Sequence, residues 1–327
     1  MSAPGPEISV AMATYEGGPF VGRQLESFAQ QARRPDEVVV CDDGSGDDTV
    51  ARVEAFAAGA PFAVRLERNP ARLGETKNFE KAIAACGGRL IFLADQDDVW
   101  RPEKVETLAA ALEDDPALDL VFSNGDVVDG QLEPLQYDLW QSLGFDAAER
   151  GRVREGGAVE VFTRHVVAAG TTLAFRARHR DWPLPFPDLP TCHDAWIAFL
   201  LAAASRVAIM ERPLIDYRVH GANRVGIRKL GMREQLEQAR RQLERGAFDY
   251  DVRFFSAARD RLREGGPGCD AGTLALIDER IAHAARRHAM SPHLLRRLPD
   301  VLREAVAGRY GRFGYGWKSV AQDLWLR

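Results

Sequence analysis

Three carboxylates follow one short apolar segment of this chain. Leu90–Ala94 is uniformly apolar, and Asp95, Asp97 and Asp98 occupy three of the next four positions, before Pro102. Carboxylates this close raise one another's pKa unless a cation or hydrogen-bond donors neutralise them. Because divalent ions such as Mg²⁺ and Mn²⁺ prefer oxygen ligands, the cluster predicts a metal site.

Three further polar clusters occupy the same kind of position, each after an apolar segment. They are Ala13-Thr14-Tyr15-Glu16, Asp42-Asp43-Gly44-Ser45 and the segment from Asn69 to Asn78. An Asp-Gly turn alone has a conformational explanation, because both residues adopt turn geometry easily. Four clusters at the carboxyl ends of strands in one sheet would share a crevice, however, and this favours a ligand site.

The segments that must position these clusters alternate between strand and helix. Apolar runs predict strands at 8–12, 37–41, 64–67, 90–94 and 118–123, and helical spacing predicts helices at 20–31, 49–58, 75–85 and 102–113. Such repeats predict a parallel sheet with right-handed crossovers.

The alternation stops after residue 124. Residues 125–165 predict long loops that form a lid or an acceptor-facing excursion. We then expect an ordered segment at 166–175, a helix from about Asp194, and a short strand at 207–210. From Gly231 the pattern is helical, with breaks at 265–268, at Pro292 and at 308–316.

Composition limits the class of protein. The chain has 327 residues, of which 46% are hydrophobic and 28% charged, which excludes a disordered or collagen-like chain. Its four cysteines are scattered without metal-ligand spacing and are expected to be reduced thiols. Residues 1–7 lack a signal-peptide pattern, and the apolar run at 195–204 is too short to span a membrane. We therefore expect a cytoplasmic protein.

Charge is unevenly distributed along the chain. The net charge of the chain is -5, but the segment from Arg286 onward contains nine Lys or Arg residues and three acidic ones, so its own net charge is +6. With its aromatic residues, this tail could contact the anionic inner face of a membrane, or it could be a solvated helical face over core aromatics. Nucleic acid is not an expected partner, because the chain as a whole is acidic.

The motifs together resemble those of the family 2 glycosyltransferases with the GT-A fold. The upstream motifs are Ile8–Glu16, Val40–Asp47, Lys77-Asn78 and Leu93–Asp98, and the downstream ones are Gly170–Phe175, His193–Trp196 and Asp216–Asn223. The resemblance covers roughly residues 7–226. Within the family, Asp-Gln-Asp-Asp-Val-Trp at 95–100 is similar to rhamnosyltransferase-like members.

The resemblance implies an α/β architecture, the Rossmann-like GT-A fold of nucleotide-diphospho-sugar transferases, with a mostly parallel sheet flanked by helices. It implies a glycosyltransferase domain at 1–226, with a nucleotide-binding half at 1–123 and an acceptor-binding half at 124–226. Residues 227–327 would be a helical C-terminal extension with the basic tail.

The resemblance also implies roles for single residues. Asp97 would be the main ligand of Mg²⁺ or Mn²⁺, with Asp95 and His220 beside it, and Asp43 would accept a hydrogen bond from the nucleobase. Asp42 would assist there or only shape its turn. The other residues implied at the nucleotide sugar are Ala13, Thr14, Tyr15, Glu16, Asn69, Lys77, Gln96 and Arg218.

The implied reaction inverts the anomeric centre in one displacement, with Asp194 as the base that takes the acceptor proton. The implied donor is a dTDP or UDP sugar, with rhamnose first, and the acceptor is a cell-surface glycan or a lipid-linked saccharide. His193 departs from the family, which often has Glu before the base. Because the Gln-x-x-Arg-Trp segment of processive synthases is absent, transfer of a single sugar is favoured.

Simpler roles remain open for several of these residues. Asp194 could cap the following helix, His220 could be structural, and Lys77 could be a solvated charge. A haloacid-dehalogenase-type phosphohydrolase would use Asp95 as nucleophile and Asp97 as acid/base, but it leaves the other clusters without a role. A non-catalytic sugar-nucleotide binding module is the third possibility.

Overall fold

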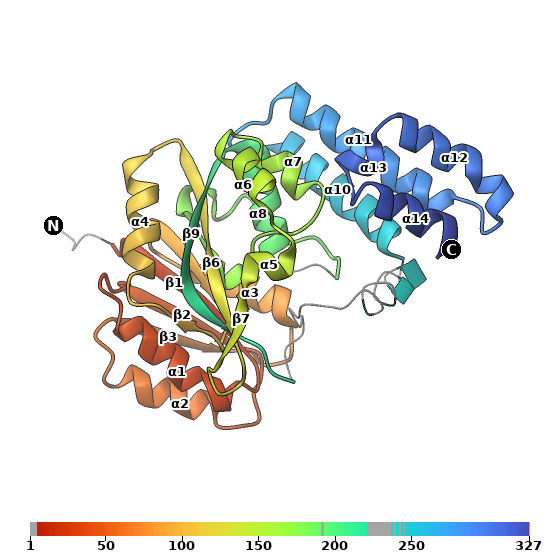
Figure 1. Cartoon of the computed structure of the whole chain (residues 1–327). Coiled ribbons are helices and arrows are strands. Elements are labelled where there is room, and N and C mark those ends of the chain that lie inside the picture. The colour runs from red at the N-terminus through yellow and green to blue at the C-terminus, as the bar shows by residue number, and fades with distance from the viewer. Residues whose placement is uncertain are drawn as a thin grey trace.

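The computed structural model describes residues 5–190, 193–221 and 246–326, with residues 234, 237, 240, 241, 243 and 244. Within these residues, nine strands form one sheet in the order β3-β2-β1-β4-β8-β6-β9-β5, and β7 pairs with β6. The sheet is covered by helices, and the C-terminal helices extend away from it (Figure 1).

The predicted strand and helix repeats of the first half are confirmed. The strands are β1 (Ile8–Thr14), β2 (Glu37–Asp42), β3 (Ala63–Arg68) and β4 (Leu90–Ala94), and the helices are α1 (Gly18–Ala29), α2 (Thr49–Ala57), α3 (Glu75–Ala85) and α4 (Lys104–Asp114). The four strands are parallel, so their carboxyl ends lie along one edge.

Beyond β4 the sheet is mixed, because antiparallel strands lie among the parallel strands that the sequence predicts. The next strand in space is β8 (Leu173–Arg176), which runs antiparallel to both β4 and β6 (Leu118–Val128). Next to β6 lies β9 (Arg206–Arg218), which is parallel to β6 and much longer than the expected 207–210. The two-residue strand β5 (Val99–Trp100) pairs antiparallel with β9 and completes the mixed sheet.

The predicted long loops at 125–165 are wrong. This segment continues β6 and then forms β7 (Pro134–Asp138), α5 (Leu139–Leu143), α6 (Ala147–Arg154) and α7 (Ala158–Phe162). The Asp138 and Asp146 carboxylates cap α5 and α6 by accepting from backbone N–H groups. Two of the Asp residues in this segment therefore mark the starts of short helices.

The two faces of the sheet bury separate sets of side chains. On one face α1, α2 and α4 pack on alternate residues of β1, β2 and β4. On the other face α3, α7 and α8 (His193–Ala204) form a second core, which also contains residues of α10 (Ala247–Glu264) and α11 (Ala271–Ala289). Both sets follow the period-two alternation of strands.

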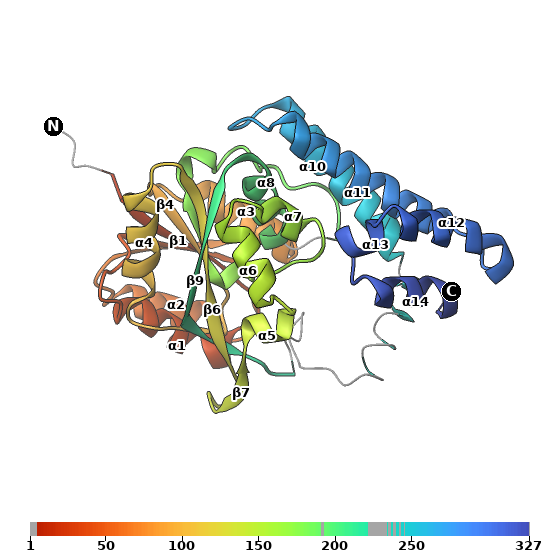
Figure 2. The ribbon, with the colours of Figure 1, turned by 45° about the horizontal axis from the view of Figure 1, so that its top comes forward.

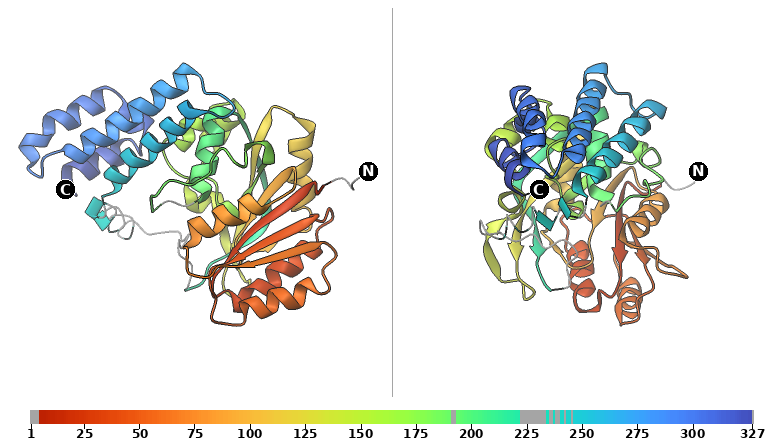
Figure 3. Two further views of the ribbon diagram at one scale, coloured as in Figure 1. Left: turned by 180° about the vertical axis from the view of Figure 1, so that it is seen from behind. Right: turned by 90° about the vertical axis from the view of Figure 1, so that its right-hand side faces the viewer.

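The C-terminal helices extend from this second core. Helices α10 and α11 lie side by side, and α12 (Leu294–Val306), α13 (Arg309–Arg312) and α14 (Trp317–Trp325) follow (Figure 2). In the view from behind, these helices project past the edge of the sheet (Figure 3). The predicted domain boundary at residue 226 lies outside the described residues. In the described part of the chain, no helix is long and apolar enough to cross a bilayer.

Candidate active site

Three of the predicted clusters meet at one edge of the sheet. The strands β2, β1 and β4 are neighbours and parallel, and they end at Asp42, Thr14 and Ala94. The segments that follow them therefore emerge side by side, as expected for a ligand site of an open α/β sheet.

The turn after β2 is held by the Asp42 carboxylate. Its Oδ1 accepts from the Gly44 and Ser45 N–H groups at 3.2 and 2.9 Å, and its Oδ2 accepts from the hydroxyls of Thr14 and Ser45 at 2.9 and 2.6 Å. Because both oxygens are occupied within the protein, Asp42 shapes the turn, which was one of its two expected roles.

Asp43 fixes the loop that leaves β3. Its Oδ1 accepts from Asn69 Nδ2 at 3.1 Å and from the Leu73 N–H at 2.6 Å, and its Oδ2 accepts from the Gly74 N–H at 2.8 Å. Asn69 also donates to Asn78 Oδ1 at 2.8 Å. This buried network fixes the Asp43 carboxylate at the strand ends, and a nucleobase contact stays a prediction.

Gln96 joins the ends of β1 and β4. Its Oε1 accepts from the Tyr15 N–H at 2.9 Å, and its Nε2 donates to the Tyr15 carbonyl at 3.0 Å. A Cβ added at Gly17 would overlap the Gln96 side-chain amide, so a larger residue there would displace this amide from Tyr15. Glu16 has a positive φ of 50°, and its N–H donates to Ser45 Oγ at 2.9 Å. Gln96 therefore positions the backbone from Ala13 to Glu16.

Asp97 and His220 meet although 123 residues separate them. The His220 Nε2 lies 2.8 Å from Asp97 Oδ2, and the His220 ring stacks on Phe20 with centroids 4.2 Å apart. The pairing of β5 with the end of β9 explains this contact, because Val99 opposes Asp216 in the ladder. The structure thus brings together two of the three expected metal ligands.

Arg218 lies close to Asp98 and Phe20. Its N–H donates to Asp98 Oδ1 at 3.0 Å, and its guanidinium carbon lies 5.0 Å from the centre of the Phe20 ring. The side chain is buried and Nη1 donates to the Gly130 carbonyl at 3.3 Å. Arg218 therefore lies beside the acidic cluster, as expected.

The carboxylates repel one another. Burial, followed by the charges of Asp98 and Asp97, raises the pKa of Asp95 well above its usual value. Burial and the Asp97 charge raise the pKa of Asp98 to about 7. A divalent cation would relieve this repulsion, and the Asp97 carboxylate and the His220 imidazole are donor types that such an ion accepts. Among the described residues, however, no three His, Cys, Asp or Glu side chains are arranged as a group that could hold a metal ion.

Asp194 starts α8 on the far side of the cluster. Its Oδ2 accepts from the Gly170 N–H at 2.9 Å, and its Oδ1 accepts from its neighbour Ala195 at 2.7 Å. Burial raises the pKa of Asp194, and the Asp194 charge in turn contributes to the raised pKa of Asp95. A partly buried carboxylate with a raised pKa is suited to accept a proton near neutral pH.

Lys77 is engaged away from the acidic cluster. Its Nζ donates to Glu80 Oε2 at 2.8 Å and to the Phe186 carbonyl at 3.0 Å. The expected contact with a diphosphate stays a prediction.

Sequence reasoning missed two cations. Arg72 lies over the Tyr15 ring, 3.8 Å from its centre, in the loop that Asp43 fixes. Lys104 is fully buried beneath the cluster, where its Nζ donates to the Thr171 carbonyl and lies 3.7 Å from the Trp100 ring centre. Burial lowers the pKa of Lys104 well below its usual value, although Asp98 and Asp95 favour its charged form. In the sequence both appear as ordinary surface charges.

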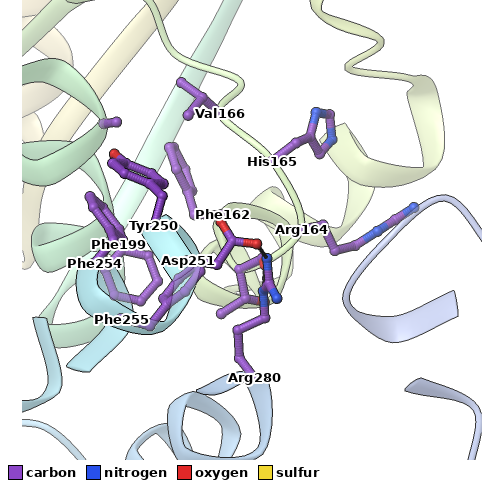
Figure 4. A pocket seen from close by; sticks show the side chains of 12 residues that line it. Phe162, Arg164, His165, Val166, Phe199, Tyr250, Asp251, Phe254, Phe255 and Arg280 are labelled. Carbon is purple, nitrogen blue, oxygen red and sulfur yellow. Dashed lines mark hydrogen bonds and ion pairs between the residues drawn. The ribbon is translucent and has the colours of Figure 1, made fainter. Parts of the chain in front are cut away.

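A separate cavity of about 90 Å³ lies behind the start of α8. Its walls come from the end of α7, from α8 and from the C-terminal helices, with Phe199, Phe254 and Phe255 on its apolar side (Figure 4). Arg280 crosses it to pair with Asp251 at 2.5 Å. The C-terminal helices thus form a wall next to the helix that carries Asp194.

His193, the departure from the expected Glu, is buried without a hydrogen-bond partner. Its ring stacks on Phe79 with centroids 3.6 Å apart, and neither ring nitrogen makes a hydrogen bond within the protein, although Nδ1 lies 4.0 Å from Glu75 Oε1. Burial lowers the pKa of His193 to about 4 from 6.5. The neutral imidazole therefore packs as an aromatic plate next to Asp194.

We predict that His193 makes the fold acid-sensitive. Since the unfolded chain binds the proton and the folded chain does not, the stability is present above pH 6.5 and is lost as the pH falls toward 4. Between pH 7 and pH 5 this should cost about 2 kcal/mol. Urea unfolding at both pH values should show that His193→Leu removes this part of the loss, whereas His288→Leu, at an exposed position, does not. An equal loss in both variants would contradict the assignment.

Comparison with known proteins finds one matching family model and several related sequences. Residues 9–168 match the model of "Glycosyl transferase family 2". An uncharacterized glycosyltransferase of Nostoc sp. is 22% identical over 217 residues, which are 66% of this chain and 66% of that protein. The glycosyltransferase EpsH of Bacillus subtilis is 26% identical, over 66% of this chain and 61% of its own length. The matched segments therefore span slightly less than two thirds of either relative.

Two solved structures share the fold. TarS of S. aureus, determined in complex with UDP-GlcNAc, superposes with a TM-score of 0.56 at 16% identity, covering 85% of this chain and 72% of TarS. A mannosyltransferase of Pyrobaculum calidifontis, in complex with GDP-Man and Mn²⁺, superposes with a TM-score of 0.53 at 19% identity, covering 98% of this chain and 85% of its own. The chain thus has the GT-A fold.

Proposed function

We propose that the chain transfers a sugar from a nucleoside-diphosphate sugar to an acceptor hydroxyl. The match of residues 9–168 to the model of "Glycosyl transferase family 2" and the GT-A fold support this proposal. The observation that carries this proposal is the arrangement of two acidic groups at one sheet edge. Asp97 pairs with His220 on one side, and the partly buried carboxylate of Asp194 lies on the other. An ion-binding carboxylate and a nearby base are what an inverting transfer requires.

We propose that the site uses Mg²⁺ or Mn²⁺. Asp97, His220 and Asp95 would hold the ion. The crowding of carboxylates supports this assignment, because the charges of Asp97 and Asp98 add to burial in raising the pKa of Asp95. The ion would neutralise the negative charge that develops on the departing diphosphate. A Mn²⁺ complex of the Pyrobaculum mannosyltransferase is consistent with this choice.

The residues of this chain then have distinct roles. The β1 end, held by Gln96, would form one wall of the nucleoside pocket, and Asp43 and Arg72 would line it. Arg218 would face the diphosphate. Asp194 would take the proton of the acceptor hydroxyl at Oδ1 or Oδ2 as the new bond forms on the face opposite the leaving group. The Gly170 N–H would hold the Asp194 carboxylate in position for this step.

For the donor, we propose a UDP or dTDP sugar, with rhamnose first, transferred one residue at a time. The acceptor we propose is a cell-surface glycan or a lipid-linked saccharide. We also propose that the protein works at the cytoplasmic face of the inner membrane, which the basic charge from Arg286 onward supports.

A thermal-shift panel tests this function. UDP, dTDP and GDP sugars should be tried with Mg²⁺, Mn²⁺ or EDTA, since a ligand that binds only the folded chain stabilises it by about 2.7 kcal/mol at a hundred times its Kd. We expect one nucleotide class to raise the melting temperature by a few degrees, and only with a divalent ion. If no nucleoside diphosphate has an effect, the proposed function is wrong.

A further inference from the structure

Helix α12 exposes apolar side chains and buries charged ones. Most of its exposed side chains are apolar, and the exposed fractions of Leu295, Leu302 and Val306 are 83%, 56% and 88%. Its buried side chains include Arg297 and Glu304, which are 3% and 0% exposed. A surface helix of a water-soluble domain normally has the opposite arrangement.

The buried charges fix the helix in this orientation. Glu304 accepts from Arg286 at 2.8 Å and from Arg309 at 3.0 Å, and it lies 2.6 Å from His283 Nδ1. Arg297 donates to the Leu324 carbonyl of α14 at 2.8 Å. Rotating α12 to bury its leucines would break these bonds and leave charges unpaired, which is costly. The apolar side must therefore face outward.

The outward residues form one continuous stripe. At 100° per residue, they fall within an arc of about 120°. Its members are Leu294, Leu295, Leu298, Leu302 and Val306. Arg296 and Arg303 are exposed and follow one edge of this arc. Helix α12 itself lies far from the sheet, among the C-terminal helices (Figures 1 and 2).

We propose that the α12 stripe docks on an anionic lipid bilayer, with the helix axis in the plane of the interface. The apolar stripe would enter the acyl boundary, and Arg296 and Arg303 would meet lipid phosphates. The charge supports a bilayer over a second copy of this acidic chain, because residues 286–327 carry +6 within a net of -5. The neighbouring α14 exposes Trp317 and Trp325, at 76% and 74%, and tryptophan favours this interface. This docking is independent of the proposed transfer reaction.

Vesicle flotation of the full chain tests the proposal. We expect the wild type to float with vesicles of phosphatidylcholine and phosphatidylglycerol and much less with phosphatidylcholine alone. Leu298→Gln with Leu302→Gln should reduce the bound fraction about tenfold on anionic vesicles, because the stripe loses two apolar anchors. Arg296→Gln with Arg303→Gln should reduce it about fivefold and remove most of the lipid preference.

Leu135→Gln is the matched control, because this leucine is also exposed, at 38%, but lies on β7. It should float like the wild type, and all variants should keep the wild-type melting temperature. Equal flotation of the stripe variants and the wild type would overturn the proposal, as would no wild-type binding. Loss of a wild-type dimer in the Leu298/Leu302 variant, without vesicle binding, would show instead that a second copy covers the stripe.

Discussion

Replacing Asp194 by Asn is expected to reduce kcat by about 10² to 10⁴-fold, the usual contribution of a general base, while binding of the nucleotide is preserved. An amide cannot take the acceptor proton. Because burial raises the pKa of Asp194, the rate of the wild type should rise with pH through that raised pKa, and the variant should lose this limb. Steady-state kinetics across pH, with the donor identified in the thermal-shift panel, would measure both effects.

The structure supplies a control for this variant. Asp188→Asn removes an exposed carboxylate from the loop that precedes α8, and it should leave kcat unchanged. An amide can replace only one of the two acceptor oxygens that Asp194 offers to Gly170 and Ala195, so unfolding must be checked separately. A folded Asp194→Asn protein with wild-type turnover would exclude the base role and leave helix capping as the function of this residue.

The local parts of the site could be predicted from sequence, and the long-range pairings could not. Strand ends at Thr14, Asp42 and Ala94 follow from short apolar runs, whose period is visible within a few residues. The insertion of β8 between β4 and β6 depends on pairing across about 50 residues to β6 and more than 80 to β4, which no local pattern encodes. The sequence therefore did not predict that an antiparallel strand separates β4 from β6.

In the site too, local features could be predicted from the sequence and long-range contacts could not. The acidic cluster at 95–98 was visible, but the partnership of Asp97 with His220 was implied only by family resemblance, because it depends on the β5 and β9 ladder. Arg72 and Lys104 looked like surface cations, since only tertiary packing places one over Tyr15 and buries the other. The helical spacing of the apolar residues in α12 is visible in the sequence. That these residues face solvent depends on the partners of Arg297 and Glu304.

Replacing Asp97 by Asn should separate metal binding from folding. We expect the Mn²⁺-dependent thermal shift with the donor nucleotide to disappear and kcat/KM to fall by at least about a hundredfold, because the amide is a weaker ligand for a hard divalent ion. Without metal, the variant should be at least as stable as the wild type, since one of the charges that raise the pKa of Asp95 and Asp98 is removed. Thermal melts with and without Mn²⁺ measure both effects.

Asp98→Asn is the matched control at the neighbouring position. The Asp98 carboxylate accepts from the Arg218 N–H, which an amide oxygen can also do, and its pKa of about 7 already leaves it largely protonated below neutral pH. This variant should keep the Mn²⁺ response. An Asp97→Asn protein that still responds to Mn²⁺ would exclude Asp97 as the main ligand. Loss of the response in both variants would instead indicate that the whole acidic cluster, and not one pair with His220, holds the ion.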